Sequence, residues 1–430
     1  MNSQIPLHRW SAVRLARALA TRDLSAATLA EALIERSHAL DPVLHVWAAF
    51  DAAAARERAR ALDDSPVRGP LHGLPLAVKD IIDTAGIPTT YGSPIYAGHV
   101  PAQDAACVSL AKAAGAWVLG KTLSTEFANM HPAATRNPHD HAHTPGGSSS
   151  GSAAAVAAGL VPFALGTQTA GSVIRPAAFC GVVGYKPSPG RIARSGVKLN
   201  SDTLDEVGIF ARSVDDVVLL ANVLGGAADA SPFVPRFGLS LTTQAAQLSG
   251  DMLRAMAASA NRLSAGGASV RDVECRASFD SLFEAQRIVQ AVETASALAP
   301  ELAYRRAALS PVLAAFLDDA RRIAPEAYAA ALARRRGARA DLDMLFADVD
   351  VLLAPAAPGV APPTLETTGD PLFSRPWQLL GCPCVALPAG HDAAGMPLGV
   401  QIIGRPQDDA RTLAAAAWAL AALRNGQVLQ

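Results

Sequence analysis

The strongest constraint on the fold is an alternation that begins at Leu71, in which short apolar runs bounded by Gly and Pro alternate with Ala-rich stretches. The apolar runs predict buried strands and the Ala-rich stretches predict helices. The strands are expected at 74–78, 117–119 and 161–165, and the helices at 105–114 and from 153 onward. Strands alternating with helices imply a sheet covered on both faces. The sequence therefore predicts an α/β fold with a central mixed, largely parallel, twisted sheet.

The rest of the chain extends this pattern without an obvious linker or repeat. Half of the 430 residues are apolar and 17% are charged, which is enough for one large core. We expect a single domain, 1–430, in four parts. These are a helical N-terminal part (1–65), a core (66–217), a mainly helical excursion with a strand at 267–273 (218–345), and a C-terminal part with strands at 349–354, 384–387 and 399–403 and a last helix from about 408 (346–430).

Charge, cysteine content and hydropathy exclude several classes of function. The formal net charge is −1, so no basic surface is expected to bind nucleic acid. The most apolar run, 153–166, is short and contains Pro162, and the first ten residues lack the pattern of a secretory signal, so no membrane span is expected. Five scattered cysteines, including Cys382 and Cys384, indicate reduced thiols in the cytoplasm. The sequence leaves a homodimer open.

Two motifs resemble sites but do not fit their context. Residues 115–122 match the letters of a phosphate-binding loop, but a helix precedes them and Ala-Trp-Val-Leu is typical of a buried strand. His139, His141 and His143 alternate as zinc ligands on a strand would, but Pro138 and Pro145 indicate a loop. We expect neither a nucleotide nor a metal at these places.

Two segments in the core carry residues suited to catalysis. Lys79 ends an apolar strand, where desolvation would favour the neutral amine, although a lysine at the surface or paired with Asp80 is the more frequent arrangement. Residues 146–152 form a Gly/Ser loop that leads directly into a strong helix-forming stretch. Such loops are often linkers, but one inside a core can direct several amides and hydroxyls to one point.

The third segment, 166–176, contains Ser172 on a turn that leaves a predicted strand, just before Pro176 could start a helix. The small residues Ala170 and Gly171 allow a substrate carbonyl to approach the backbone, whose amides could hold an oxyanion. A serine in such a turn is by itself more often structural.

Together these segments resemble the amidase signature family. Gly-Gly-Ser148-Ser-Ser-Gly-Ser and Ala-Gly-Ser172 have the family's order and spacing, followed by Pro176-Ala-Ala-Phe-Cys-Gly and Lys186-Pro. The strand that ends in Lys79-Asp80, the turn 120–127 and the strand 397–404 extend the similarity over nearly the whole chain, weakly at 222–348.

The resemblance implies an amide hydrolase that needs no cofactor and acts on a small-molecule amide. It places the nucleophile at Ser172, the bridging serine at Ser148 after a cis peptide bond, and the base at Lys79. It implies an oxyanion hole made by the backbone N–H groups of residues 169–172 (Thr169, Ala170, Gly171 and Ser172). Three alternatives remain: an esterase or aryl-amide hydrolase with the same triad, an ammonia-supplying subunit of an amidotransferase complex, and a non-catalytic binding module. The last would predict loss of a triad member.

The nucleophile motif departs from the commonest form of the family. Gln168 replaces an acid, Ala170 replaces a glycine, and Arg175 lies three residues after the nucleophile rather than two. This variant resembles malonamidase-type members, which act on small amides that carry a carboxylate. We therefore expect Arg175 and Gln168 to orient an amide-acid substrate, with pairing of Arg175 to an acid elsewhere as the alternative.

Overall fold

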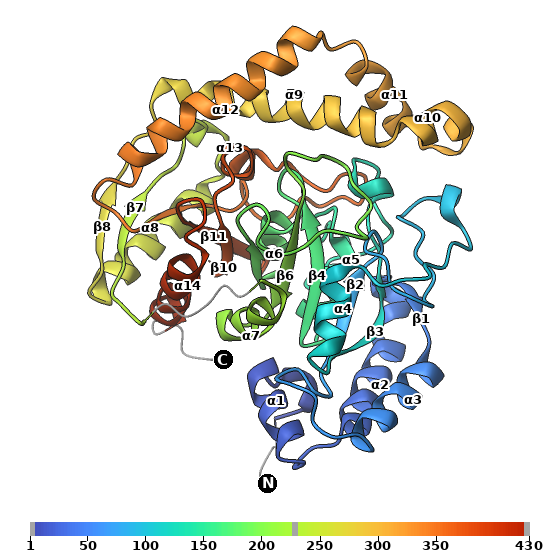
Figure 1. The fold of residues 1–430 in the computed structure, drawn as a ribbon. Coiled ribbons are helices and arrows are strands. Elements are labelled where there is room, and N and C mark those ends of the chain that lie inside the picture. Colours follow the sequence, from blue (N-terminus) through green and yellow to red (C-terminus); the bar gives the residue numbers. More distant parts are fainter. Residues whose placement is uncertain (1–4, 226–230, 425–430) are drawn as a thin grey trace.

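The computed structural model describes residues 5–225 and 231–424. In this part of the chain, eleven strands form one sheet: β1 (Trp47–Phe50), β2 (Pro75–Lys79), β3 (Trp117–Thr122), β4 (Phe163–Gln168), β5 (Val183–Lys186), β6 (Glu206–Ala211), β7 (Arg236–Leu239), β8 (Ser269–Asp272), β9 (Val351–Pro355), β10 (Cys384–His391) and β11 (Pro397–Ile403). Their spatial order is β1-β3-β2-β4-β6-β5-β10-β11-β9-β7-β8 (Figure 1).

The α-helices surround this sheet (Figure 1). They are α1 (Ala12–Ala20), α2 (Ala26–Leu44), α3 (Ala52–Asp63), α4 (Ala106–Ala113), α5 (Ser150–Ala157), α6 (Ile174–Cys180), α7 (Val214–Gly225), α8 (Gly250–Ala265), α9 (Asp280–Ala297), α10 (Ala299–Arg305), α11 (Pro311–Ala320), α12 (Pro325–Leu345), α13 (Arg375–Leu380) and α14 (Asp409–Arg424). Several begin at side-chain caps; Ser11, for example, accepts the N–H of Arg14 at the start of α1. No described helix is both long enough and apolar enough to cross a bilayer.

The sheet is mixed, as predicted, but the expectation that it is largely parallel is wrong. Of the strand pairs in the described chain, four are parallel and six are antiparallel. The antiparallel pairs run without interruption through the centre, from β4 to β9. Alternation of apolar and helical segments predicts layers but not strand direction, and the hairpin of β10 with β11 has no helix between its strands. The strands β1, β5, β6 and β7 were also not predicted.

Glycines in the central strands allow helix α6 to lie unusually close to one face of the sheet. A Cβ atom at Gly184 would be 2.5 Å from the Cβ of Ala177, and one at Gly399 would be 2.5 Å from the Cβ of Ala178. Tyr185, the next residue on β5, points to the opposite face and donates a hydrogen bond of 2.7 Å to Asp409 on α14. The close packing of α6 fixes the turn that precedes it, which contains Ser172.

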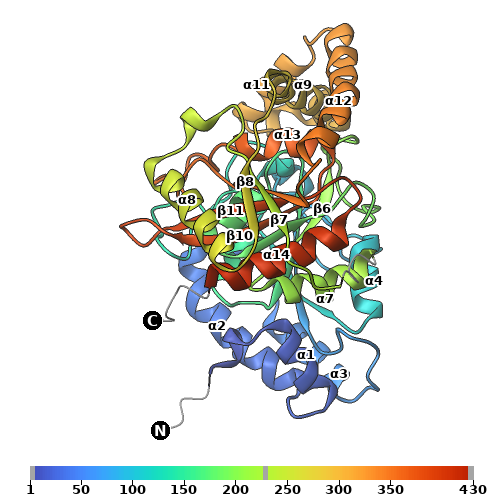
Figure 2. The ribbon, with the colours of Figure 1, turned by 90° about the vertical axis from the view of Figure 1, so that its left-hand side faces the viewer.

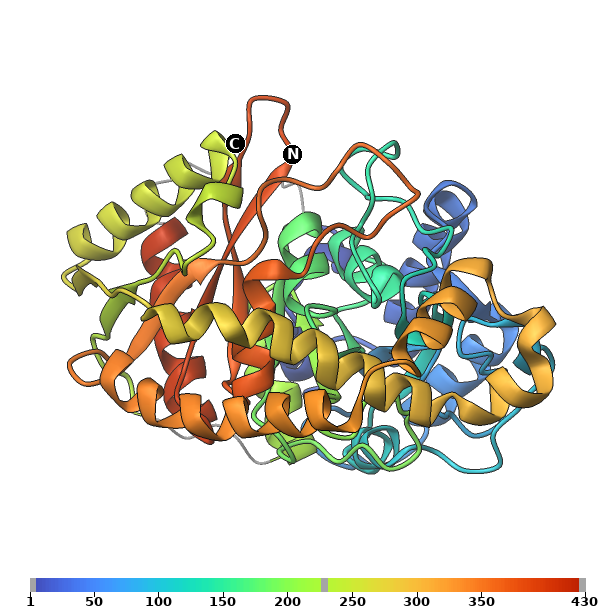
Figure 3. The same cartoon turned by 90° about the horizontal axis from the view of Figure 1, so that it is seen from above.

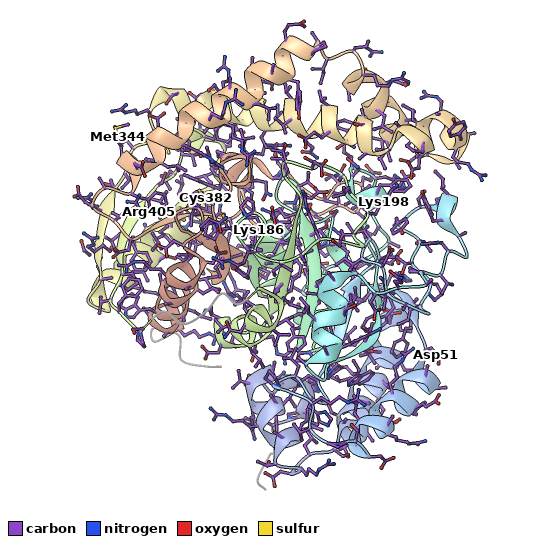
Figure 4. The ribbon with its side chains drawn as sticks, in the orientation of Figure 1. Asp51, Lys186, Lys198, Met344, Cys382 and Arg405 are labelled. Atoms are coloured by element: carbon purple, nitrogen blue, oxygen red, sulfur yellow. The ribbon has the colours of Figure 1, made fainter. Side chains whose placement is uncertain are left out.

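The helices α9 to α12 of the helical excursion lie over one edge of the sheet, whereas its strands β7 and β8 belong to the sheet and α8 packs beside them. Helices α9 and α12 run side by side across the top of the molecule, and α13 lies beneath them (Figures 1 and 3). In the perpendicular view, α14 and α7 lie beside the sheet and α9, α11 and α12 form a separate layer above it (Figure 2). Figure 4 shows the side chains that fill the interior, including Lys186 at the end of β5. The excursion therefore covers the edge at which β2 and β4 end.

Candidate active site

The parallel pair β2 and β4 brings the ends of two strands together. Val78 on β2 lies opposite Leu165 on β4, so both strands end at the same edge of the sheet. Lys79 is the last residue of β2, and Ser172 lies in the turn between β4 and α6. The carboxyl ends of parallel strands are a common position for active sites because the loops that follow them converge there.

Lys79 is completely buried and its amine contacts two hydroxyl groups. Its Nζ lies 2.7 Å from Ser148 Oγ and 2.8 Å from Thr167 Oγ1. Burial lowers the pKa of Lys79 to about 7, and the negative charge of Asp205 opposes this shift. Asp80, the partner proposed in the alternative interpretation, instead accepts hydrogen bonds from the N–H and hydroxyl of Thr90. Lys79 can therefore act as a base near neutral pH.

The Gly/Ser loop that contains Ser148 is held in one conformation by its own hydroxyl groups. The Gly147–Ser148 peptide bond is cis. Ser150 donates a hydrogen bond of 2.7 Å to the carbonyl of Gly146, and Ser149 donates one of 3.1 Å to the carbonyl of Thr167. The loop is therefore buried structure and not a linker, and its hydrogen bonds tie Ser148 to strand β4.

Ser148 and Ser172 line the same cavity, which has a volume of about 280 Å³. The cavity is also lined by residues 169–171, by Arg175, and by Gln290 and Arg375 from α9 and α13. No hydrogen bond joins the hydroxyls of Ser148 and Ser172 in the structure as described. A larger cavity of about 640 Å³ lies beside Tyr91, Lys198 and Tyr328 and contains none of the predicted catalytic residues.

The predicted oxyanion-hole residues form the wall of this cavity beside the nucleophile. Thr169, Ala170, Gly171 and Ser172 all line it. Within the described ranges, no protein acceptor receives a hydrogen bond from the backbone N–H groups of these four residues. Ala170 has a negative φ, so alanine fits the position that a glycine often occupies in the family. These N–H groups remain available to a substrate oxygen.

Gln168 does not face the cavity. Its side-chain oxygen accepts hydrogen bonds from the N–H groups of Val173 (2.8 Å) and Ile174 (3.0 Å), and its Nε2 donates to Gln378 Oε1 (2.9 Å). The amide thus caps the start of α6 and joins it to α13, which uses both its acceptor and its donor. Its hydrogen bonds favour a positioning role in place of the expected contact with substrate.

Arg175 lines the cavity and is buried, but its guanidinium already binds the protein. One terminal nitrogen donates to the carbonyl of Gly369 (2.8 Å), and the other donates to the carbonyl of Gly147 (2.6 Å) and to Thr368 Oγ1 (3.0 Å). The alternative of an acidic partner is not observed, because the described chain places no carboxylate within 4 Å of it. Burial and the nearby charge of Arg375 lower the pKa of Arg175 to about 9. Arg175 thus binds the carbonyl of the cis peptide group itself.

Four further residues complete the site and were not predicted from the sequence. Thr167 is the second partner of Lys79, and Asp205 accepts the hydroxyl of Thr169 at 2.6 Å. Gln286 on α9 donates 3.1 Å to the carbonyl of Thr169 and accepts a hydrogen bond from Arg375. A signal for Arg375 was present, because it is the single charge in the otherwise largely apolar stretch 371–380. Thr167 lies in the segment 166–176 that contains Ser172, but nothing in the sequence marked its hydroxyl as a partner of Lys79. Asp205 and Gln286 come from segments whose approach only the tertiary structure reveals.

The histidine-rich loop is not arranged as a metal site. His139 Nε2 lies 3.0 Å from the carbonyl of Cys180, and His143 Nδ1 lies 3.2 Å from Asp140 Oδ2. Across residues 5–225 and 231–424, no group of three or more His, Cys, Asp or Glu side chains is placed to hold a metal ion.

Comparison with known proteins agrees with this geometry. The Amidase family model matches residues 28–413, which is most of the chain. The chain belongs to the amidase family. This amidase is similar to a crystal structure described as an amidase, with 32% identity, a TM-score of 0.89, and coverage of 96% of this chain and 99% of that one. It is also similar to the peptide amidase of Stenotrophomonas maltophilia, with 29% identity, a TM-score of 0.84, and coverage of 97% and 98%.

The curated relatives include a protein from a multi-subunit enzyme. A subunit of the glutamyl-tRNA(Gln) amidotransferase of Roseiflexus castenholzii is 34% identical to this amidase, over 94% of each chain. Membership of the family and likeness to these hydrolases identify the chain as an enzyme that acts on amide C–N bonds. The predicted family, fold and reaction class are thereby confirmed.

Proposed function

We propose that this amidase hydrolyses a small carboxylic amide through an acyl-enzyme on Ser172, with Ser148 as the bridging hydroxyl and Lys79 as the base. The observation that carries the proposal is the contact between the fully buried amine of Lys79 and Ser148 Oγ, at 2.7 Å. Ser148 in turn lines the same cavity as Ser172. A serine hydroxyl is a weak nucleophile until a neighbouring base removes its proton. A neutral lysine that reaches it through a second hydroxyl supplies that base.

In the first half of the reaction, Ser172 Oγ forms a bond to the amide carbon while its proton passes to Ser148. The proton of Ser148 passes at the same time to neutral Lys79. Ser148 and Ser172 share no hydrogen bond in the free enzyme, and we assign that contact to the substrate complex, in which catalytic hydrogen bonds commonly shorten. The electron pair of the carbonyl moves to its oxygen, which the backbone N–H groups of residues 169–172 stabilise. Loss of one such donor typically costs about 100- to 1,000-fold in rate.

In the second half, the C–N bond breaks and the leaving nitrogen takes a proton from Ser148, which is reprotonated by Lys79. Ammonia or an amine leaves and the acyl group stays on Ser172. A water molecule then gives its proton to the same relay and attacks the acyl carbon. Collapse of that intermediate releases the carboxylic acid and returns the proton to Ser172, so Lys79 ends the cycle neutral.

The charges around the cavity favour a substrate that carries a carboxylate. Arg175 and Arg375 both line the cavity, together with one acid, Glu366, and neither arginine has a carboxylate within 4 Å in the described chain. The positive potential of two arginines in a partly desolvated site attracts an anion. We therefore propose an amide-acid as the substrate class. Arg175, which holds the carbonyls of Gly147 and Gly369, contributes charge and keeps Ser148 in place.

The test is ammonia release by the purified chain from a panel of simple amides and amide-acids, with Ser172→Ala as the blank. We expect turnover by the wild type and a loss of about 10⁶-fold in kcat when the nucleophile is removed. Turnover by Ser172→Ala at the wild-type rate would exclude the proposed acyl-enzyme. Faster cleavage of the matching esters than of the amides would favour the esterase alternative.

A second candidate is the ammonia-supplying subunit of an amidotransferase complex. It is favoured by the similarity to the amidotransferase protein of Roseiflexus castenholzii. The two candidates differ in what the isolated chain does: a stand-alone hydrolase releases ammonia at full rate, whereas one component of a complex works poorly without its partners.

A further inference from the structure

The catalytic cavity continues into a second cavity beneath the helical excursion. This outer cavity has a volume of about 380 Å³ and lies between α9, α11 and α13. It shares Met130, Gln290 and Arg375 with the catalytic cavity, so these three residues stand at the junction of the two. The remaining lining is mainly apolar, from Ile288, Ala291, Phe316 and Ile323, with Glu284 and Arg287 also present.

The guanidinium of Arg375 is bound on one side only. One terminal nitrogen donates to Gln286 Oε1. The Nε is buried and has no hydrogen-bond partner, and the second terminal nitrogen makes no hydrogen bond within the described residues. Nε and one terminal nitrogen form the edge that binds a carboxylate with two parallel hydrogen bonds. Arg175 differs, because both of its terminal nitrogens already donate to the protein.

Gln286 links Arg375 to the proposed oxyanion hole. Its Nε2 donates 3.1 Å to the carbonyl of Thr169, which belongs to the same peptide group as the N–H of Ala170. A hydrogen bond to that carbonyl holds the peptide plane and polarises its N–H. The same Nε2 donates 3.1 Å to Gln290 Oε1, so the side chain of Gln286 has little freedom to rotate. Its orientation therefore depends on Arg375 at one end and on the peptide at the other.

We infer that Arg375 is the specificity-determining residue of this amidase: its free edge binds the carboxylate of an amide-acid, and its bound edge holds Gln286 against the 169–170 peptide. The inference rests on the proposed function. An anion at the junction of the two cavities leaves the amide of a short chain pointing toward Ser172. The class of substrate is therefore the monoamide of a dicarboxylic acid. Arg375 is a binding residue in this scheme, and Gln286 is a positioning residue.

The experiment compares two matched series of probes. Malonamate, succinamate and glutaramate carry a carboxylate, and propionamide, butyramide and valeramide replace it by a methyl group. For Arg375→Gln we expect kcat/KM on the best anionic probe to fall by about 30- to 100-fold, mainly through KM, because a charge-assisted bidentate contact is worth roughly 2–3 kcal/mol. On the neutral probes we expect a loss of no more than a few fold. Arg375→Lys should restore part of the anionic activity.

Two further variants distinguish binding of the substrate carboxylate from positioning of the oxyanion hole. Arg336→Gln removes an exposed arginine of α12 that lines neither cavity, and we expect both series to be unchanged. Gln286→Leu should lower kcat by about tenfold on both series and leave KM for the anionic probe nearly unchanged, because it affects the oxyanion hole and not the anion.

Two results would overturn the inference while the proposed function stands: equal losses on both series for Arg375→Gln, or a wild type that prefers the neutral probes. Failure of the wild type on all six probes, or turnover by Ser172→Ala, would instead overturn the proposed function. A binding measurement provides an independent check. Malonate, succinate or glutarate should raise the melting temperature of Ser172→Ala and lose that effect when Arg375→Gln is added.

Discussion

Two buried lysines on neighbouring strands show which surroundings turn a lysine into a base. Lys79 on β2 and Lys121 on β3 are both completely buried, and Val78 lies opposite Lys121 in the parallel pair. Burial lowers both pKa values, to about 7 for Lys79 and about 8 for Lys121. Low pKa alone therefore does not separate a catalytic lysine from a structural one.

The two amines differ in what they contact. Lys79 donates hydrogen bonds to the hydroxyls of Ser148 and Thr167, and Ser148 lines the catalytic cavity. Lys121 donates to the carbonyl of Ile82 and to Thr84 Oγ1 (3.0 Å) and has no contact with the cavity wall. Asp80 and Asp83 raise the pKa of Lys121 against the effect of burial. A hydroxyl beside a cavity is a proton donor for catalysis, whereas a backbone carbonyl only anchors the chain.

The largest expected effect comes from removing the base. Lys79→Met should lower kcat/KM by about 100- to 10,000-fold, the usual contribution of a positioned general base. It should leave stability within about 1 kcal/mol, because the lost hydrogen bonds are offset by removal of an amine that is costly to bury. Urea unfolding and a rate assay on the same preparation measure both quantities. A stable variant with wild-type rates would remove Lys79 from the mechanism.

A smaller effect is expected at the second partner of Lys79. Thr167→Val keeps the shape of the side chain and removes the hydroxyl that accepts from Nζ. The free amine can then turn away from Ser148, and we expect a loss of about fivefold in kcat, equivalent to roughly 1 kcal/mol. Steady-state kinetics at pH 8, with Thr84→Val beside Lys121 as the matched control, tests this. A loss of the same size in the control would show that the effect is not specific to the base.

The pH dependence should carry the pKa of Lys79. The base is active when unprotonated, so kcat/KM should rise with pH through a midpoint of about 7 and level off above it. Asp205 raises this pKa, so Asp205→Asn should move the midpoint to lower pH. The profile is recorded on one substrate in buffers of constant ionic strength. A midpoint that moves to higher pH in Asp205→Asn would contradict the electrostatic account.

The smallest effect on catalysis is expected at Lys121. Lys121→Met should change kcat/KM by no more than a few fold, but it should destabilise the protein by about 1–3 kcal/mol, because the carbonyl of Ile82 and the buried Asp80 lose a charged neighbour. This is the reverse of the result expected for Lys79→Met. The urea midpoint and the rate per folded molecule give the two values. A variant with intact stability and low activity would end the distinction between the two lysines.

The sequence predicted which residues gather at the candidate site better than it predicted the residues that support them. Lys79, Ser148 and Ser172 lie in short motifs that resemble those of the family, and it was this resemblance, rather than residue type or spacing alone, that placed them in one site. Apolar patterning alone could not distinguish Lys79 from Lys121, which lies next to the last residue of the buried strand β3. It also could not show that Gln168 caps α6, because that depends on how its side chain turns.

Local sequence patterns could not predict the direction of the strands or the residues that line the far side of the cavity. The antiparallel centre of the sheet follows from how connections cross the molecule, which apolar periodicity does not encode. Gln286 and Arg375 lie more than 100 residues after the nucleophile and reach the site only when α9 and α13 pack together. The helical excursion resembles the family only weakly in sequence. It nevertheless provides part of the cavity wall, through Gln290 and Val312.

Direct titration of the Lys79 side chain tests the central claim most simply. Heteronuclear NMR of Ser172→Ala, with the lysine signals assigned through Lys79→Met and Lys121→Met, follows each amine as the pH changes. The account predicts that Lys79 loses its proton with a midpoint of about 7. A Lys79 that keeps its charge up to about pH 10, as an ordinary lysine does, would contradict it.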